Sequence, residues 1–221
     1  MQTEDRDLTV DSVTDRITGT GVLPVIVIDD LAHARPLAQS LVDSGLHTAE
    51  VTFRTPQALE ALAVFAEHPE LLVGAGTVRT AEQVRRAQDA GARFVVSPGF
   101  SEPVVEACRA QEVPVFPGVS SATDIHRATE AGLDVLKFFP AEASGGAAAI
   151  AALAAPFPDV RFVPTGGVGP RNLDDYLALP TVCCVGGSWM VPRDAMRAGD
   201  WARIIELCRR AVEQVAPLHR R

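Results

Sequence analysis

The chain contains a single lysine, and that lysine lies in an apolar run. Lysine and arginine together number 20 among the 221 residues, and all of them are arginine except Lys137. Because side chains alternate along a strand, Val135, Lys137 and Phe139 share one face. Burial disfavours the ammonium form of a lysine, and a neutral amine can form a Schiff base with a carbonyl. The alternative is a snorkelling or ion-paired structural lysine, but the apolar neighbours favour chemistry at this position.

A second apolar run, Ala49–Phe53, carries polar side chains at alternate positions. Glu50, Thr52 and the following Arg54 share one face. A carboxylate beside an amine can shuttle protons, and a guanidinium can bind a substrate carboxylate through two parallel hydrogen bonds. A plain Glu–Arg ion pair is the alternative. Two positions along a strand span about 7 Å, so the two groups can serve different atoms of one ligand.

Two glycine-rich segments follow the last two apolar runs. They are Pro164-Thr165-Gly166-Gly167-Val168-Gly169-Pro170 and Val185-Gly186-Gly187-Ser188-Trp189. In phosphate-binding barrels, the loops after strands seven and eight hold the phosphate with backbone N–H groups. One Gly-Gly pair is usually only a turn, whereas two pairs at these places predict a phosphorylated substrate. The segments 74–78 and 97–100 either line the same rim or form turns.

These residues must be positioned by regularly alternating elements. Apolar runs of four to eight residues, rich in Val, Ile or Phe, predict eight strands: 22–28, 49–53, 71–78, 93–97, 113–119, 135–139, 161–165 and 182–186. Stretches between them, such as 81–90 and 103–111, have helical spacing. Helix starts are predicted at Thr80, Ser101 and Pro170, and helix ends before Gly45, Gly91 and Gly132.

Eight strand–helix units predict an α/β fold in which a (β/α)8 TIM barrel uses every unit. An open doubly wound sheet is the rival, but no Gly-x-Gly-x-x-Gly follows the first strand. We expect a short N-terminal helix over residues 11–20 that closes the bottom of the barrel. Residues 1–221 then form one domain, with residues 1–10 flexible.

Composition excludes several other classes of protein. The formal net charge of -8 and the lack of a basic cluster argue against nucleic-acid or anionic-membrane binding. The five histidines, His33, His47, His68, His126 and His219, lack metal-type spacing, so we expect no metal site. The four cysteines are too few for a disulfide framework, and we interpret the adjacent Cys183 and Cys184 as small buried hydrophobes. With no secretory signal and no membrane span, a soluble cytoplasmic protein is expected.

Several segments together resemble the 2-keto-3-deoxy-6-phosphogluconate (KDPG) aldolases, class I pyruvate aldolases of the Entner–Doudoroff pathway, a family that also includes 4-hydroxy-2-oxoglutarate aldolases. The resemblance runs from the second to the eighth predicted strand. It is carried by Glu50-Val51-Thr52-Phe53-Arg54-Thr55, Gly74-Ala75-Gly76-Thr77-Val78, Ser97-Pro98-Gly99-Phe100, Lys137-Phe138-Phe139-Pro140-Ala141-Glu142, Pro164-Thr165-Gly166-Gly167-Val168 and Gly186-Gly187-Ser188-Trp189. The family fold is a (β/α)8 barrel, and its members assemble as homotrimers.

The resemblance implies a role for each matching residue. Lys137 corresponds to the Schiff-base lysine and Glu50 to the acid/base that shuttles protons. Arg54 and Thr77 correspond to the residues that hold the pyruvate carboxylate, and Phe139 to one that packs near the reacting carbons.

The same resemblance implies that Gly166, Gly167, Gly187 and Ser188 bind the phosphate. Thr165 matches a position where family members acting on the gluconate-derived substrate have threonine and those acting on its galactonate epimer have valine. It therefore favours the gluconate epimer.

The implied activity is a lyase of carbohydrate metabolism that cleaves KDPG to pyruvate and D-glyceraldehyde 3-phosphate without a metal or organic cofactor. The alternatives are a 4-hydroxy-2-oxoglutarate aldolase and a 2-dehydro-3-deoxy-6-phosphogalactonate aldolase. A more remote one is a barrel that binds a phosphorylated ligand without catalysis, because fold resemblance does not guarantee activity.

Overall fold

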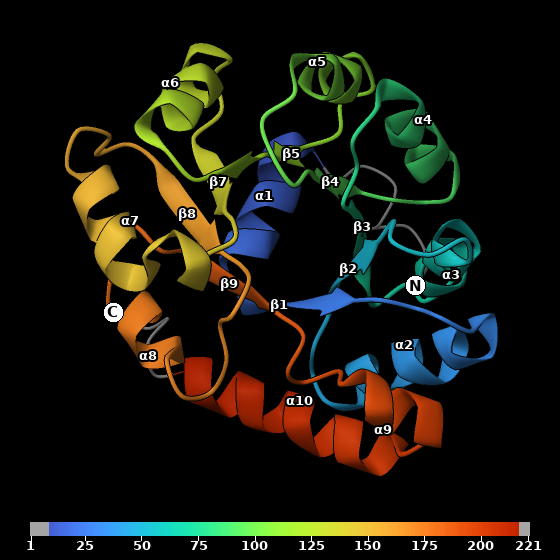
Figure 1. Cartoon of the computed structure of the whole chain (residues 1–221). Coiled ribbons are helices and arrows are strands. Elements are labelled where there is room, and N and C mark those ends of the chain that lie inside the picture. Colours follow the sequence, from blue (N-terminus) through green and yellow to red (C-terminus); the bar gives the residue numbers. More distant parts are fainter. Residues whose placement is uncertain (1–8, 217–221) are drawn as a thin grey trace.

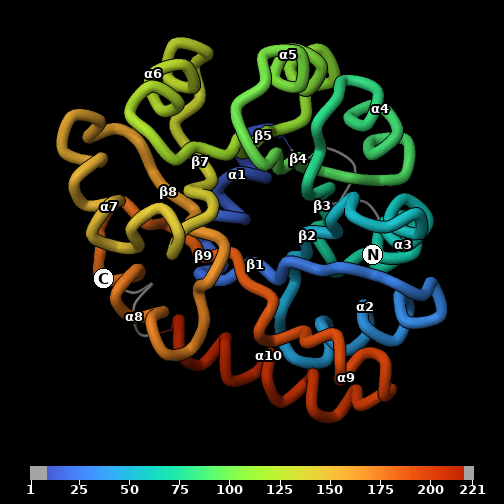
Figure 2. The backbone as a smooth tube through the Cα atoms, in the orientation of Figure 1, coloured from blue at the N-terminus to red at the C-terminus, as the bar shows by residue number. Residues whose placement is uncertain are grey.

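The computed structural model describes residues 9–216, in which helices surround a set of central strands (Figures 1 and 2). The helices are α1 (Val10–Thr18), α2 (Ala34–Asp43), α3 (Ala58–Ala66), α4 (Ala81–Asp89), α5 (Glu102–Ala110), α6 (Ala122–Glu130), α7 (Gly146–Ala154), α8 (Leu173–Leu177), α9 (Arg193–Ala198) and α10 (Trp201–Val215), with short 3-10 turns η1 (Leu31–His33) and η2 (Glu142–Ser144). The strands are β1 (Gly21–Ile26), β2 (Thr48–Thr52), β3 (Leu72–Gly76), β4 (Phe94–Val96), β5 (Val115–Phe116), β6 (Gly118–Val119), β7 (Val135–Phe138), β8 (Arg161–Pro164) and β9 (Cys184–Gly187). Each of the eight predicted runs contains a strand.

The strands pair in parallel throughout the described residues. One sheet has the order β5-β4-β3-β2-β1-β9, and a second has the order β6-β7-β8. Two single parallel bridges, Phe162 with Val182 and Thr165 with Gly186, join the second sheet to the segment that contains β9. The prediction of a parallel α/β fold is therefore confirmed.

One predicted strand, residues 113–119, is divided into β5 and β6. Pro117 lies between the two pieces. Proline has no N–H to donate to the strand ladder, so it interrupts regular pairing. Pairing with β7 nevertheless includes this position: the Pro117 carbonyl accepts a hydrogen bond of 2.9 Å from the Lys137 N–H, directly before β6.

The strands bury both of their faces, as a parallel sheet covered by helices requires. On β7, Leu136 and Phe138 belong to the large apolar cluster under the outer helices. Val135 belongs to a smaller inner cluster, which comprises Val13, Ile17, Leu23, Leu72, Phe94, Val96, Phe116, Val135, Val163 and Cys184. We call the side of the strands that faces this cluster the inner face. The predicted alternation along β7 therefore holds, and Lys137 is on the inner face with Val135.

The expected N-terminal helix is present and contributes to the inner cluster. Val13 and Ile17 of α1 are both buried there. Of the residues 1–10 that were expected to be flexible, Thr9 and Val10 lie at the start of this helix: α1 begins at Val10, and the Thr9 side chain accepts a hydrogen bond of 3.2 Å from the Ser12 N–H. The rest of that segment, residues 1–8, lies outside the described residues.

The predicted helix ends agree with the structure more closely than the predicted starts. Gly45, Gly91 and Gly132 have left-handed φ values of 81°, 96° and 72°. Thr80 caps α4, as predicted, whereas Ser101 occupies the N-cap position of α5 without a capping side-chain bond. The helix predicted at Pro170 begins instead at Leu173, because the side chain of Asn172 binds the preceding loop and keeps it non-helical.

The difference between Thr80 and Ser101 gives a paired stability test. The Thr80 hydroxyl accepts a hydrogen bond of 3.2 Å from the Gln83 N–H, so Thr80→Ala should lower the free energy of unfolding by about 1 kcal/mol. Ser101→Ala, which removes no capping bond, should change it by clearly less. Urea titration of both variants measures the two differences. Equal losses would show that the Thr80 bond does not stabilise α4.

Candidate active site

Lys137 of β7 and Glu50 of β2 meet on the inner face, although 87 positions separate them in the chain. Lys137 Nζ donates a hydrogen bond to Glu50 Oε1 at 3.3 Å, and the two side chains are only 3% and 1% exposed. Both line one small internal cavity together with Thr165. The remaining lining residues are apolar, namely Ile17, Leu23, Val96, Phe116 and Val163.

This pairing decides which partner Glu50 has, and it makes Lys137 an ion-paired lysine, which fits both a structural and a chemical role. An isolated ammonium or carboxylate buried among apolar groups is strongly unfavourable, and mutual pairing compensates much of that cost. Glu50 pairs with Lys137, so the simple Glu50–Arg54 pair is not what the structure shows. An amine beside a carboxylate in a largely apolar cavity can act as a nucleophile with its own proton shuttle.

A neighbouring strand makes room for the Glu50 carboxylate. Gly76 ends β3 opposite Thr52 of β2. A Cβ atom at Gly76 would lie 2.6 Å from Glu50 Cγ and 2.8 Å from Cδ, far inside van der Waals contact. Gly76 therefore belongs to a strand rather than to a turn, and its missing side chain provides the space that Glu50 occupies.

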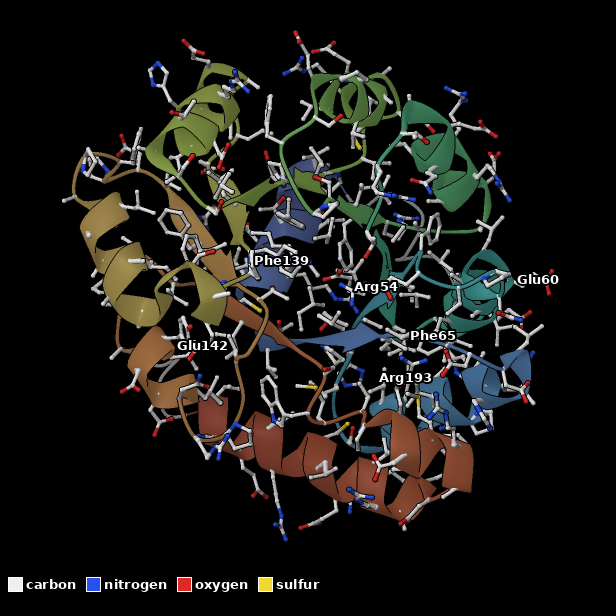
Figure 3. The ribbon with its side chains drawn as sticks, viewed as in Figure 1. Arg54, Glu60, Phe65, Phe139, Glu142 and Arg193 are labelled. Carbon is white, nitrogen blue, oxygen red and sulfur yellow. The ribbon has the colours of Figure 1, made fainter. Side chains whose placement is uncertain are left out.

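Phe139 and Arg54 both lie near the middle of the ring of helices (Figure 3). The Phe139 ring centroid is 5.1 Å from Lys137 Nζ, close enough for a cation–π interaction. Arg54 is exposed, and its Nε donates a hydrogen bond of 3.1 Å to Thr77 Oγ1. Within residues 9–216 its guanidinium forms no ion pair, so its charge is available to an anionic ligand.

The glycine-rich ends of β8 and β9 lie side by side. Thr165 is bridged to Gly186, where an added Cβ would lie 3.2 Å from Thr165 Cβ. Gly166 and Gly167 have left-handed φ values of 100° and 84°, which strongly favour glycine.

The amides of these ends are available to a ligand. Among the hydrogen bonds of the described residues, none uses the amide N–H of Gly166, Gly167 or Ser188 as donor. Gly187 is the last residue of β9, directly before the exposed Ser188. Unpaired backbone N–H groups next to one another form a site suited to an anion.

Three residues that support these ends were not singled out from the sequence. The Asn172 side chain donates to the Gly167 carbonyl at 3.2 Å and accepts from the Gly169 N–H at 2.8 Å. Glu142 hydrogen-bonds with Tyr176 beside the same turn. Glu142 is part of the motif around Lys137, and this was the only signal that could have drawn attention to any of the three.

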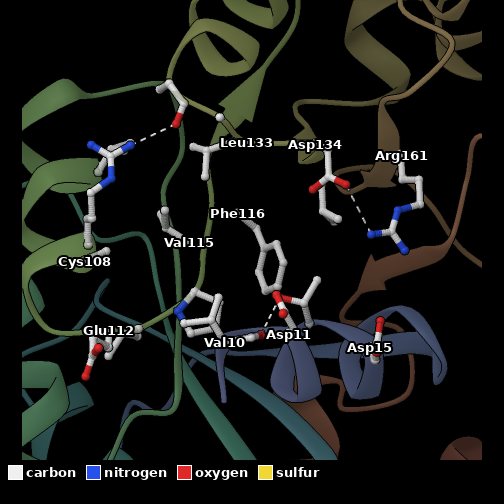
Figure 4. Close-up of a pocket in the computed structure, with 18 residues that line it drawn as sticks. Val10, Asp11, Asp15, Cys108, Glu112, Val115, Phe116, Leu133, Asp134 and Arg161 are labelled. Atoms are coloured by element: carbon white, nitrogen blue, oxygen red, sulfur yellow. Dashed lines mark hydrogen bonds and ion pairs between the residues drawn. The ribbon is translucent and has the colours of Figure 1, made fainter.

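A larger cavity, of about 680 Å³, lies away from this site (Figure 4). Its wall includes Asp11 and Asp15 of α1 and the ion pair between Arg161 and Asp134, which are 3.5 Å apart. Neither Lys137 nor Glu50 borders it. We therefore assign the chemistry to the small inner cavity and the strand ends above it, where the reactive groups converge.

The cysteines do not offer a rival nucleophile. All four are free, and burial raises the pKa of Cys183 to about 11 and the pKa of Cys108 and Cys208 to about 12. Burial likewise raises the pKa of Cys184. These thiols stay protonated near neutral pH and therefore react slowly. Cys183 is only half-buried, so the interpretation as a buried hydrophobe fits Cys184 better.

Residues 9–216 contain neither a metal-binding cluster nor a membrane-spanning helix. No group of three or more His, Cys, Asp or Glu side chains in that range is arranged to hold a metal ion. No helix in the same range has the length and apolar character needed to cross a bilayer.

The close contact between Gly76 and Glu50 gives a second stability test. Gly76→Ala should lower the free energy of unfolding by about 1–3 kcal/mol, because the added methyl group collides with Glu50. Gly99→Ala is the matched control, since a Cβ there meets nothing within 4 Å. Repeating Gly76→Ala in a Glu50→Ala background should abolish the cost, measured by urea unfolding. A cost that persists there would exclude Glu50 as its origin.

Comparison with known proteins places this site in context. The family model described as "KDPG and KHG aldolase" matches residues 13–207. The KHG/KDPG aldolase of Escherichia coli strain K12 is 49% identical over 198 residues, covering 89% of this chain and 93% of the relative. The 2-dehydro-3-deoxy-phosphogluconate aldolase of Pseudomonas aeruginosa is 47% identical over 201 residues, covering 90% of this chain and 91% of the relative.

Solved structures agree. KDPG aldolase from Legionella pneumophila, with pyruvate captured as a covalent carbinolamine, has a TM-score of 0.87 and 42% identity, covering 92% of this chain and 98% of the other. The Zymomonas mobilis ZM4 enzyme with 3-phosphoglycerate has a TM-score of 0.86 and 43% identity, covering 92% and 96%. With most of its length matched in sequence and in structure, the chain belongs to the KDPG and KHG aldolase family.

Proposed function

We propose that this protein is a class I aldolase that cleaves KDPG to pyruvate and D-glyceraldehyde 3-phosphate. The observation that carries the proposal is the buried contact between Lys137 Nζ and Glu50 Oε1, beneath strand ends with unpaired amides. The relatives from P. aeruginosa and Zymomonas mobilis, named for this activity, are 47% and 46% identical to the chain.

The chemistry follows from the geometry of the pair. Glu50 accepts a proton from the Lys137 ammonium, and the neutral amine attacks the C2 ketone. Glu50 returns this proton to the departing hydroxyl, which leaves as water, and a protonated imine remains as an electron sink. Glu50, through a water molecule, removes the proton of the C4 hydroxyl, and the electrons of the C3–C4 bond flow into the imine. Glyceraldehyde 3-phosphate leaves. The enamine is then protonated at C3 and hydrolysed to pyruvate, which restores Lys137.

The strand ends supply substrate recognition at two places. Arg54 and Thr77, at the ends of β2 and β3, bind the carboxylate next to the ketone. Phe139 packs against the reacting carbons above Lys137.

At the ends of β8 and β9, the amides of Gly166, Gly167 and Gly187, together with Ser188, bind the phosphate. The capture of pyruvate and the binding of 3-phosphoglycerate by related enzymes are in keeping with this division.

We further propose that residues 1–221 form one domain and that the two sheets close into a (β/α)8 barrel. The bridges between Phe162 and Val182 and between Thr165 and Gly186 support closure on one side. The continuity of β5 and β6 across Pro117 supports it on the other. The homotrimer remains a prediction of the family resemblance, and the cytoplasmic location remains a prediction from the sequence.

The alternative substrates differ in defined chemical groups. Relatives named KHG/KDPG aldolase support additional activity on 4-hydroxy-2-oxoglutarate, which lacks the phosphate. The galactonate epimer is less favoured, because the structure described as native KDPGal is 27% identical, against 42% and 43% for the two KDPG aldolases. The ratio of kcat/KM among the three substrates distinguishes the alternatives. A binder without catalysis would have no use for the buried Lys137–Glu50 pair.

Borohydride trapping tests the amine directly. Treatment with pyruvate and borohydride should leave one reduced adduct per chain, at Lys137, the only lysine side chain. Peptide mass mapping separates it from modification of the N-terminal amine. Lys137→Ala should give no side-chain adduct and no detectable cleavage of KDPG while keeping its circular dichroism spectrum. An unmodified wild-type protein, or turnover by Lys137→Ala, would contradict the assignment of Lys137.

Replacement of Glu50 tests the proton shuttle. Glu50→Gln keeps the size of the side chain but cannot accept a proton, so kcat for KDPG should fall by about 10²–10⁴-fold. Glu67→Gln, at an exposed position paired with Arg35, is the control and should leave kcat unchanged. Steady-state kinetics with coupled detection of pyruvate measures both. Nearly unchanged kcat for Glu50→Gln would remove Glu50 from the mechanism.

A further inference from the structure

Two side chains that the proposed mechanism does not use meet beside the Gly166–Gly167 turn. Glu142 begins η2, just after β7, and Tyr176 lies on α8. The Tyr176 hydroxyl donates a hydrogen bond to Glu142 Oε1. Tyr176 is the only tyrosine of the chain and is 1% exposed, whereas Glu142 is exposed to solvent. The hydroxyl therefore reaches the carboxylate from the buried side.

Glu142 touches the turn through both its backbone and its side chain. Its N–H donates a hydrogen bond of 3.0 Å to the Gly166 carbonyl. A Cβ atom at Gly167 would lie 2.5 Å from Glu142 Cγ and 2.7 Å from its Cβ, so the side chain lies directly against this glycine. The position of Glu142 therefore helps to determine the position of the turn.

The start of α7 also lies close to the pair. A Cβ at Gly146, the first residue of α7, would lie 3.4 Å from Glu142 Oε1 and 3.6 Å from the Tyr176 hydroxyl, which is ordinary van der Waals contact. Figure 3 shows Glu142 on the side of the strands where α7 and α8 lie. The contact between Glu142 and Tyr176 therefore lies where η2, α7 and α8 meet.

The hydrogen bond from Tyr176 also limits the repulsion between the Glu142 carboxylate and an anion bound at the turn. Burial first, and then the bond to Glu142, raise the pKa of Tyr176 far above its usual value, so its hydroxyl remains a donor. A carboxylate free to move next to a phosphate would repel it. A buried donor that holds the carboxylate toward α8 limits this repulsion and fixes the turn at the same time.

From this arrangement we infer that Glu142 and Tyr176 are positioning residues for the phosphate group of the substrate. They act through the Gly166–Gly167 turn and do not touch the reacting atoms. The inference rests on the proposed aldolase function and deepens it, because it makes the preference for phosphorylated over unphosphorylated keto acids depend on a hydrogen bond behind the turn.

Tyr176→Phe removes the hydroxyl and keeps the ring, so it tests the hydrogen bond directly. KM for KDPG should rise about tenfold, the effect expected for the loss of a hydrogen bond to a charged group. By contrast, kcat/KM for 4-hydroxy-2-oxoglutarate should stay at its wild-type value. Inhibition by inorganic phosphate should weaken in parallel with the KDPG effect. Asp175→Asn, an exposed change on the same helix, is the control and should alter none of these values.

Variants of Glu142 distinguish the effect of this side chain's position from the effect of its charge. They also provide the test if the Tyr176→Phe protein does not fold. Glu142→Gln keeps an acceptor for Tyr176 and should retain the low KM for KDPG, whereas Glu142→Ala should raise it. Equal changes on both substrates would show a merely structural role and overturn the inference, as would an unchanged KM in Tyr176→Phe. Failure of the wild-type protein to form a pyruvate adduct would instead overturn the proposed function.

Discussion

The buried contact between Lys137 and Glu50 is the constraint on which the rest of the site depends. Two opposite charges can lie among apolar groups only if they face each other closely, because either one alone would be too poorly solvated. The strands meet this condition by directing both side chains to the inner face. Gly76 provides the space for the carboxylate, and α1 contributes Val13 and Ile17 to the apolar surroundings.

Around this pair, recognition is divided among different strand ends. The ends of β2 and β3 carry the exposed guanidinium of Arg54 and the hydroxyl of Thr77. The ends of β8 and β9 carry unpaired backbone amides. Each group therefore lies within a few residues after the end of a parallel strand, so only short segments have to orient it. In the proposed function, these ends supply the carboxylate site and the phosphate site around one amine.

The phosphate side depends on residues from outside its own loop. Asn172 holds the Gly167–Gly169 segment by two hydrogen bonds, and Glu142 reaches the same turn from the end of β7. Tyr176 connects Glu142 to α8. The segment that carries the amine and the segment proposed to bind the phosphate are thereby coupled through direct contacts. A substrate held at both ends would be kept in register with Lys137.

The amino-acid sequence by itself predicted the strands and the shared face of Val135 and Lys137, because apolar alternation is a local property of each strand. That this face points inward was decided by the tertiary structure. The sequence also identified the residues of the candidate site, through motifs that resemble one family. Only the tertiary structure decided that Lys137 pairs with Glu50, 87 positions away. The Glu142–Tyr176 contact likewise became visible only there. The pairings join residues far apart in the chain, whose distances follow from how strands and helices pack rather than from the spacing of residues.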